Sequence, residues 1–269
     1  MIDYADDGPS DVLVLAYHAV SDHWDAVTTV TPGQLRQQML YLLERGYRAV
    51  TFDCALSTPP NGRVMAVTFD DAHRSVFEIA FPMLRALGVV ATVFAPTDHI
   101  GTGQPTGWEG FEHAAQGPHA SELICMDWDQ LRTVAAAGWE VGSHTCTHPH
   151  LTRLGPDALA EELIRSRREI EEQMQLPCRT VAYPYSDLNA RVVAAAGAAG
   201  YAFGATIPVG STLAVPLRWA RVGVFRVDSF SRFRLLTSQA TRGFVMTKTG
   251  ARAAHAVRRV KGYARRARR

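Results

Sequence analysis

Three groups of polar residues follow apolar segments, and their types are those that bind metal ions and transfer protons. His18 ends the run DVLVLAYH, and Asp70 and Asp71 directly follow VMAVTF. Two adjacent carboxylates beside a buried strand need a neutralising cation, either a metal ion or a basic side chain. The same pair could instead cap the next helix, where the helix dipole favours negative charge.

The segment SHTCTHPH places His144 and His148 four residues apart, with His150 close behind. Two imidazoles and one carboxylate form a facial metal site that leaves positions open for water and substrate. This spacing also occurs in turns with incidental histidines, so by itself it is a weak signal. Together with Asp71 at the end of a neighbouring strand, it predicts a metal centre.

Short apolar runs alternate with longer amphipathic ones, which predicts parallel strands alternating with helices. The predicted strands are residues 11–18, 47–52, 64–69, 89–94, 139–143 and 180–183, with two more in YAFGAT and ARVGVF. The predicted helices are residues 32–45, 127–137, 156–175 and 188–199, and one that ends near Gly88. Such an alternation indicates a barrel, in which sites lie at the carboxyl ends of the strands. Thr97–Glu122 is expected to be a long loop.

The segments VTFDDAHRS, GWEVGSHTCTHPHLT and VAYPYSDLN, in this order, resemble the leading motifs of the polysaccharide deacetylase family. This family is also called the NodB-homology family, or carbohydrate esterase family four. LAYHAVS and MDWDQL are similar to further segments of the family, so the resemblance runs from Leu15 to Phe225. It implies an α/β fold, a distorted (β/α) barrel of about seven strands.

The resemblance also implies a site and its roles. A divalent ion, zinc in the first place, is held by the second Asp of the pair and by both histidines, which are Asp71, His144 and His148 here. Asp70 is the general base that takes a proton from the attacking water. The metal and the backbone N–H of Tyr185 stabilise the oxyanion.

The chain departs from the family's pattern before the third motif. Many members carry an arginine there that pairs with the base, whereas Val181 and Ala182 occupy that stretch here. We therefore expect the partner of Asp70 to come from PLRWARVGV, with Arg221 as the first choice and Arg218 as the alternative.

The chain departs from the family's pattern in two further ways: two glycines are replaced by other small residues, and a late histidine is missing. Ala72 and Ser186 stand where glycines often follow the first and third motifs. No histidine between His150 and His255 could protonate the leaving amine, as a late histidine does in many members. His18 is the expected substitute, although it could equally hydrogen-bond the backbone at a strand end.

The composition is that of an ordinary globular protein, but its charge is unevenly distributed. Apolar residues make up 47% and charged residues 20%. Residues 241–269 hold ten Lys or Arg and no Asp or Glu, which leaves a net −8 on residues 1–240. We expect a barrel domain at 1–240 and a basic tail, helical or disordered, at 241–269. The tail is either simply solvated or contacts an anionic membrane, and nucleic acid is not an expected partner.

The four cysteines lack CxxC spacing and are expected to be free thiols. The segment MIDYADDGPSD has neither the basic start nor the apolar run of a signal peptide. We therefore expect a cytoplasmic protein, or one peripheral at the inner face of the membrane.

These features predict a metal-dependent hydrolase that removes the N-acetyl group from a GlcNAc-type amino sugar, in a glycan or a biosynthetic intermediate. In the cytoplasm the substrate would be a lipid-linked saccharide, a nucleotide sugar or a small glycoside rather than finished polymer. Two alternatives stay open. One is removal of a formyl group or an O-acetyl ester by the same metal-assisted chemistry, and the other is a catalytically inactive glycan-binding barrel.

Overall fold

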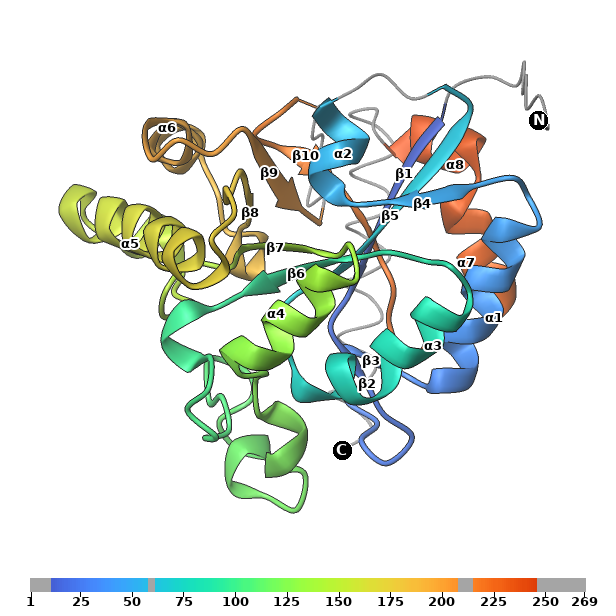
Figure 1. Ribbon diagram of the computed structural model, residues 1–269, viewed down its shortest axis with the longest axis horizontal. Coiled ribbons are helices and arrows are strands. Elements are labelled where there is room, and N and C mark those ends of the chain that lie inside the picture. The colour runs from blue at the N-terminus through green and yellow to red at the C-terminus, as the bar shows by residue number, and fades with distance from the viewer. Residues whose placement is uncertain (1–10, 58–60, 208–214, 246–269) are drawn as a thin grey trace, which may run out of the picture.

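The centre of the molecule is a parallel sheet curved into a nearly closed barrel, with helices on its outside (Figure 1). The computed structural model describes residues 11–57, 61–207 and 215–245. The predicted (β/α) barrel is confirmed.

All pairings in the main sheet are parallel, in the order β10-β9-β8-β7-β6-β5-β1-β11, and β4 also pairs with β5. Its strands are β1 (Asp11–Tyr17), β4 (Arg48–Val50), β5 (Arg63–Phe69), β6 (Thr92–Ala95), β7 (Glu140–Ser143), β8 (Thr180–Ala182), β9 (Phe203–Thr206), β10 (Trp219–Ala220) and β11 (Val222–Gly223). A separate small sheet pairs β2 (Ala19–Val20) with β3 (Thr29–Val30).

The α-helices are α1 (Pro32–Leu43), α2 (Phe52–Ser57), α3 (Phe81–Ala86), α4 (Trp128–Ala136), α5 (Pro156–Met174), α6 (Ala190–Ala198), α7 (Phe230–Thr237) and α8 (Gln239–Val245). One π-helical turn, η1 (Val76–Ala80), precedes α3. Short 3-10 turns are η2 (Thr97–His99), η3 (Ala114–Gln116), η4 (Ala120–Leu123), η5 (Leu151–Arg153) and η6 (Pro184–Ser186).

The helix ends follow from local sequence signals. Thr31 caps α1 through a reciprocal pair of hydrogen bonds with Gln34, and Asp127 caps α4 in the same way with Gln130. After α1 the chain turns at Gly46, whose φ of +79° favours glycine. These capping residues explain why the starts of α1 and α4 are predictable from sequence.

Two predicted elements differ from the structure. The strand expected at 47–52 is shorter, because Phe52 already begins α2. The helix that ends near Gly88 begins with the π-turn, in which the Phe81 N–H bonds to the Val76 carbonyl. Pro82 follows at once and has no N–H to donate, so the regular helical ladder is interrupted there.

The barrel closes through one short segment near the end of the described chain. β10 pairs with β9, and β11 pairs with β1, so residues 219–223 join the two edges of the sheet. Arg221 lies between these two pairings, and its N–H donates to the Thr206 carbonyl at 2.8 Å. Its position at this seam directs the buried Arg221 side chain into the barrel.

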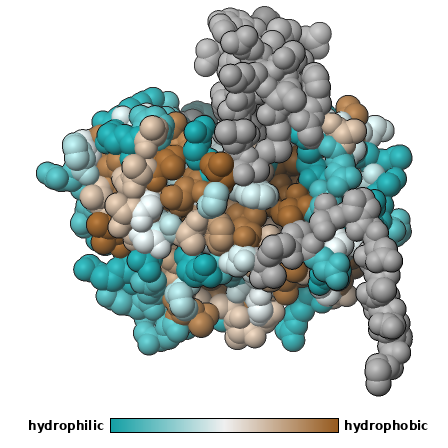
Figure 2. All heavy atoms as spheres, turned by 90° about the horizontal axis from the view of Figure 1, so that it is seen from above, coloured by the Kyte–Doolittle hydropathy of each residue, from teal (hydrophilic) through white to brown (hydrophobic). Residues whose placement is uncertain are grey.

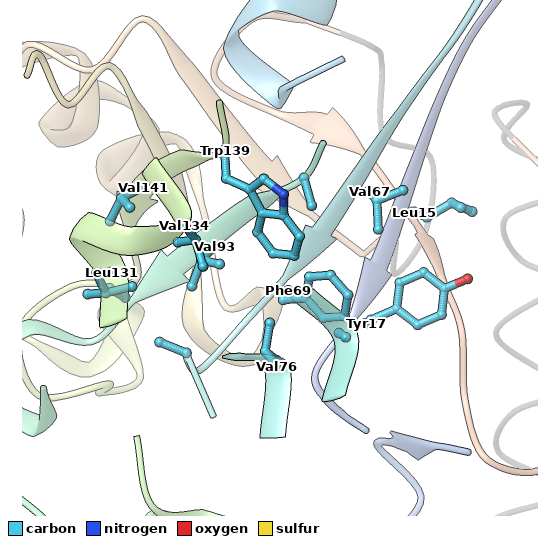
Figure 3. Close-up of a cluster of buried hydrophobic side chains, with 14 of the residues drawn as sticks. Leu15, Tyr17, Val67, Phe69, Val76, Val93, Leu131, Val134, Trp139 and Val141 are labelled. Atoms are coloured by element: carbon cyan, nitrogen blue, oxygen red, sulfur yellow. The ribbon is translucent and has the colours of Figure 1, made fainter. Parts of the chain in front are cut away.

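Alternation along the strands separates two cores. Outward-facing residues of β1 and β5, such as Leu15, Tyr17 and Phe69, pack with buried residues of the helical layer, as Figure 3 shows around Trp139. Phe69 and Trp139 stack at 5.9 Å with nearly parallel rings. The barrel interior holds mostly small residues around two phenylalanines: Val14, Phe52, Ala66, Phe94, Ala182 and Ala205. A Cβ at Gly142 would lie 2.7 Å from the Phe94 ring, so only glycine fits there.

The end of the barrel at which β1 begins is viewed in Figure 2, where apolar residues occupy the middle of the face and hydrophilic ones its rim. No helix among the described residues is long and apolar enough to cross a membrane.

The expected domain boundary after residue 240 falls within α8, whose Arg242 donates to the Asp11 carboxylate. The remainder of the expected tail, 246–269, lies outside the described residues.

Candidate active site

A cavity of about 280 Å³ opens at the carboxyl ends of the strands. It is lined by His18, Thr28, Asp70, Asp71, Trp108, Phe111, His144, His148, Tyr183, Tyr185, Ser186, Ile207 and Phe225. The sequence positions expected to share a pocket therefore do so, although they come from four strand ends spread over most of the chain.

Three of these residues form a cluster that could hold a metal ion. The ligand atoms of Asp71, His144 and His148 all lie within 4.8 Å of one another, and all three residues are buried. Oδ1 of Asp71 lies 3.3 Å from His144 Nε2 and 3.4 Å from His148 Nε2. This oxygen is buried and has no hydrogen-bond partner among the described residues. A divalent ion would satisfy it, and three such ligands leave coordination positions open.

The tautomer of His144 also fits a metal. Its Nδ1 lies 2.8 Å from the Ala182 carbonyl, which can only accept, so the ring hydrogen is on Nδ1. The lone pair of Nε2 is then directed at the cluster. Histidines that bind metals usually donate their other N–H to a backbone carbonyl or a carboxylate in this way.

The loop that carries both histidines is held by α5. The Glu162 carboxylate accepts the backbone N–H groups of Cys146 and Thr147, at 2.8 and 3.0 Å, and the Thr147 hydroxyl at 2.6 Å. Thr145 and His148 have φ values of +66° and +60°, a region that side chains other than glycine rarely adopt. The Glu162 contacts offset this cost. Glu162 could not be predicted as a site residue from the sequence, because nothing local to it signals contact with a loop fifteen residues away.

Left-handed backbone recurs at the other two motifs. Asp71 and Ala72 have φ values of +69° and +48°, and Tyr185 and Ser186 have values of +56° and +55°. Ala72 and Ser186, at the positions where glycine often occurs in the resembled family, thus have a backbone conformation that suits glycine. The backbone of this chain keeps that conformation with Ala72 and Ser186.

Asp70 forms a buried bidentate pair with Arg221. Nη1 lies 2.6 Å from Oδ1 and Nη2 lies 2.7 Å from Oδ2, and Nη1 also donates to the Thr68 hydroxyl at 2.8 Å. The expected pairing with Arg221 is thus present, and the alternative, Arg218, is not the partner. Burial by itself would raise the pKa of Asp70, but the charge and hydrogen bonds of Arg221 outweigh it and lower that pKa.

His18 faces the same pocket, and its Nε2 lies 3.9 Å from Asp70 Oδ2. Its Nδ1 is buried and has no hydrogen-bond partner among the described residues, which argues against the alternative in which His18 binds the backbone. Burial lowers the pKa of His18, and the nearby carboxylates of Asp71 and Asp70 only partly oppose this.

The expected long loop lies over the site, where it contributes Trp108 and Phe111 to the lining of the pocket. Its Trp108 stacks on His148 with ring centroids 4.1 Å apart, and its Glu109 lies 3.3 Å from His150 and 3.0 Å from Arg153. The ring of Tyr185 stacks on that of His150, with ring centroids 4.0 Å apart. The loop thereby limits access to His148, a contact that no periodicity in its sequence indicated.

A further histidine was missed although it follows the Asp pair closely. His73 Nε2 lies 3.3 Å from Asp71 Oδ2, and the residue is only 2% exposed. Burial by itself would raise the pKa of Asp71, but the surrounding imidazoles of His144, His73, His18 and His148 outweigh it and lower that pKa well below its ordinary value. The two-residue spacing within VTFDDAHRS was the available signal.

Comparisons with known proteins agree with these motifs. A family model described as polysaccharide deacetylase matches residues 57–204. YxkH of Bacillus subtilis (strain 168), provisionally named a polysaccharide deacetylase, is 24% identical over 208 residues, which cover 76% of this chain and 67% of YxkH.

Solved structures share the fold. BC0361, a polysaccharide deacetylase from Bacillus cereus, superposes with a TM-score of 0.70 at 22% identity, covering 84% of this chain and 69% of that one. IcaB from Ammonifex degensii superposes with a TM-score of 0.68 at 24% identity, covering 86% of this chain and 99% of that one. These likenesses confirm the NodB-type distorted barrel predicted from the motifs.

Proposed function

The chain belongs to the polysaccharide deacetylase family and so acts on acetylated carbohydrate, and from this premise we propose that it is a metal-dependent hydrolase that removes the N-acetyl group from an amino sugar. The observation that carries the proposal is the buried cluster of Asp71, His144 and His148 beside the Asp70–Arg221 pair. A carboxylate and two imidazoles suit a divalent ion, and zinc is the first choice.

In this proposal Asp71, His144 and His148 hold the ion. When bound, the ion would polarise the amide carbonyl and lower the pKa of a water molecule. The burial of all three residues keeps bulk water from competing for the same ligand atoms.

Asp70 accepts the proton of the attacking water. Its pairing with Arg221 keeps the carboxylate ionised and fixes both of its oxygens, so the base needs no reorganisation before it acts. The main-chain N–H of Tyr185, at the wall of the pocket, donates to the developing oxyanion.

Hydrolysis joins the water oxygen to the carbonyl carbon, breaks the C–N bond, and releases acetate and an amine that must gain a proton. His18 is our assignment for that proton transfer. Its Nε2 lies 3.9 Å from Asp70 Oδ2, within reach of proton exchange through one water, so His18 can pass to the amine the proton that Asp70 took from the attacking water.

Aromatic side chains make the pocket suitable for a sugar ring. Trp108, Phe111, Tyr185 and Phe225 line it and offer flat apolar faces, while Thr28 and Ser186 offer hydroxyl groups. We propose a cytoplasmic, lipid-linked or nucleotide-linked N-acetyl sugar as substrate. The ten basic residues of 241–269 support a contact with anionic lipid at the inner membrane face.

The test is a mass-spectrometric screen of the purified zinc-loaded protein against N-acetyl sugars that are free, nucleotide-linked or lipid-linked. N-formyl and O-acetyl analogues belong in the same panel, because they report the alternative activities. We expect loss of acetyl from at least one N-acetyl member, and none with the Asp70→Asn variant. A zinc-binding protein that releases acyl from no member of the panel would refute the proposal and favour a glycan-binding barrel.

A further inference from the structure

The two oxygens of the Asp71 carboxylate have different surroundings. Oδ1 faces His144 and His148, whereas Oδ2 lies 3.3 Å from Nε2 of His73. A carboxylate can only accept, so the hydrogen of this contact is on the His73 ring. His73 is not among the residues whose ligand atoms gather within 4.8 Å in the described structure, so it contacts the carboxylate from outside the metal cluster.

His73 is held rigidly in this position. The backbone on either side of it is tied to one segment, through hydrogen bonds from the Arg74 N–H to Ile124 and from the Met126 N–H to Ala72. Its ring packs nearly perpendicular to that of the buried Trp24, with ring centroids 6.4 Å apart at 83°. The ring therefore has little freedom to turn away from Asp71.

The other nitrogen of the ring makes no compensating contact. Nδ1 of His73 is buried and has no hydrogen-bond partner among the described residues. If the side chain at this position served packing alone, an apolar residue would be more stable than histidine, because buried polar atoms without a hydrogen-bond partner cost free energy. The contact of Nε2 with the Asp71 carboxylate, at 3.3 Å, is thus the polar interaction that accounts for a histidine here.

We propose that His73 is a positioning residue for the metal ligand Asp71. By donating to Oδ2 it would fix the plane of the carboxylate and direct Oδ1 toward the ion that Asp71, His144 and His148 would hold. This inference rests on the proposed metal-dependent function. Partners that orient a metal ligand typically affect metal affinity or activity about 10- to 100-fold.

The experiment measures the zinc dissociation constant of the full chain by competition with a chromogenic chelator. His73→Leu removes the hydrogen bond, and we expect the constant to rise about 10- to 100-fold. His73→Gln carries an amide N–H at a similar reach and should restore affinity to within a few-fold of the wild type. His23→Leu removes an exposed histidine and should change nothing.

A second pair of variants keeps the test decisive if the leucine variant does not fold. His73→Asn is polar but too short to reach Oδ2, so it should bind zinc more weakly than His73→Gln. Equal zinc affinities for the asparagine, glutamine and wild-type proteins would overturn the inference. A wild-type protein that binds no zinc would instead refute the proposed function, so the two failures are distinguishable.

Discussion

Replacing Arg221 with leucine should lower the free energy of unfolding by about 3–5 kcal/mol, because the variant leaves a buried carboxylate without its cation. The guanidinium of Arg221 makes two hydrogen bonds to Asp70 and one to Thr68, all between 2.6 and 2.8 Å. At this separation the Coulomb attraction is about 6 kcal/mol for an effective dielectric constant of about 20. Desolvation of the two groups offsets part of that gross value.

The loss has a specific origin that a double-mutant cycle isolates. Asp70→Asn alone leaves the guanidinium unpaired, and Arg221→Leu alone leaves the carboxylate unpaired. With both changes neither charge of this pair remains, so the double variant should lose less stability than the two single variants together, by about 0.5–3 kcal/mol. Urea unfolding of the four proteins under identical conditions provides the values.

A second arginine offers a matched control. Arg165 also makes a bidentate pair, with Asp98, but about a third of each side chain is exposed to water. Arg165→Leu should therefore cost only about 0–1 kcal/mol. An equally small cost for Arg221→Leu, or strict additivity in the cycle, would refute the reasoning that burial makes the Asp70 pair important.

Four further outcomes are expected. His144→Ala should lower zinc content and acetate release together, and full activity in excess chelator would contradict the metal assignment. His18→Ala should keep its zinc but lose about 10²–10⁴-fold in turnover, and an unchanged rate would leave His18 without a catalytic role. Burial raises the pKa of Glu140, so the stability that the protonated carboxyl contributes is present at acid pH and is lost as pH rises through that raised value. Relative to the wild type, Glu140→Gln should therefore gain stability from acid to neutral pH. Urea unfolding that shows the same pH dependence for both proteins would contradict this expectation. Deleting residues 248–269, which lie outside the described residues, should preserve activity on a soluble sugar but weaken salt-sensitive sedimentation with anionic vesicles, and identical sedimentation would indicate a merely solvated tail.

Local signals in the sequence determined the class of fold and the place of the site. Capping residues such as Thr31 and Asp127 mark helix starts, because their hydrogen bonds span only three residues. Apolar runs followed by Asp70 or His144 mark strand ends, and parallel strands in a barrel bring those ends to one face. The segment PLRWARVGV also offered Arg221, as the first choice, and Arg218 as partners of Asp70.

Tertiary structure decided which groups touch. Arg221 meets Asp70 only because residues 219–223 close the barrel between β9 and β1, a contact across 151 residues of chain. The cover formed by Trp108 and the hold of Glu162 on the histidine loop likewise depend on packing between distant segments. Even the contact between His73 and Asp71, only two residues apart, could not be predicted from the sequence, because it depends on the left-handed backbone at Asp71, which turns the His73 ring onto the carboxylate. Periodicity reports which face of an element is buried, whereas side-chain contacts depend on register, closure and backbone direction, which no local pattern specifies.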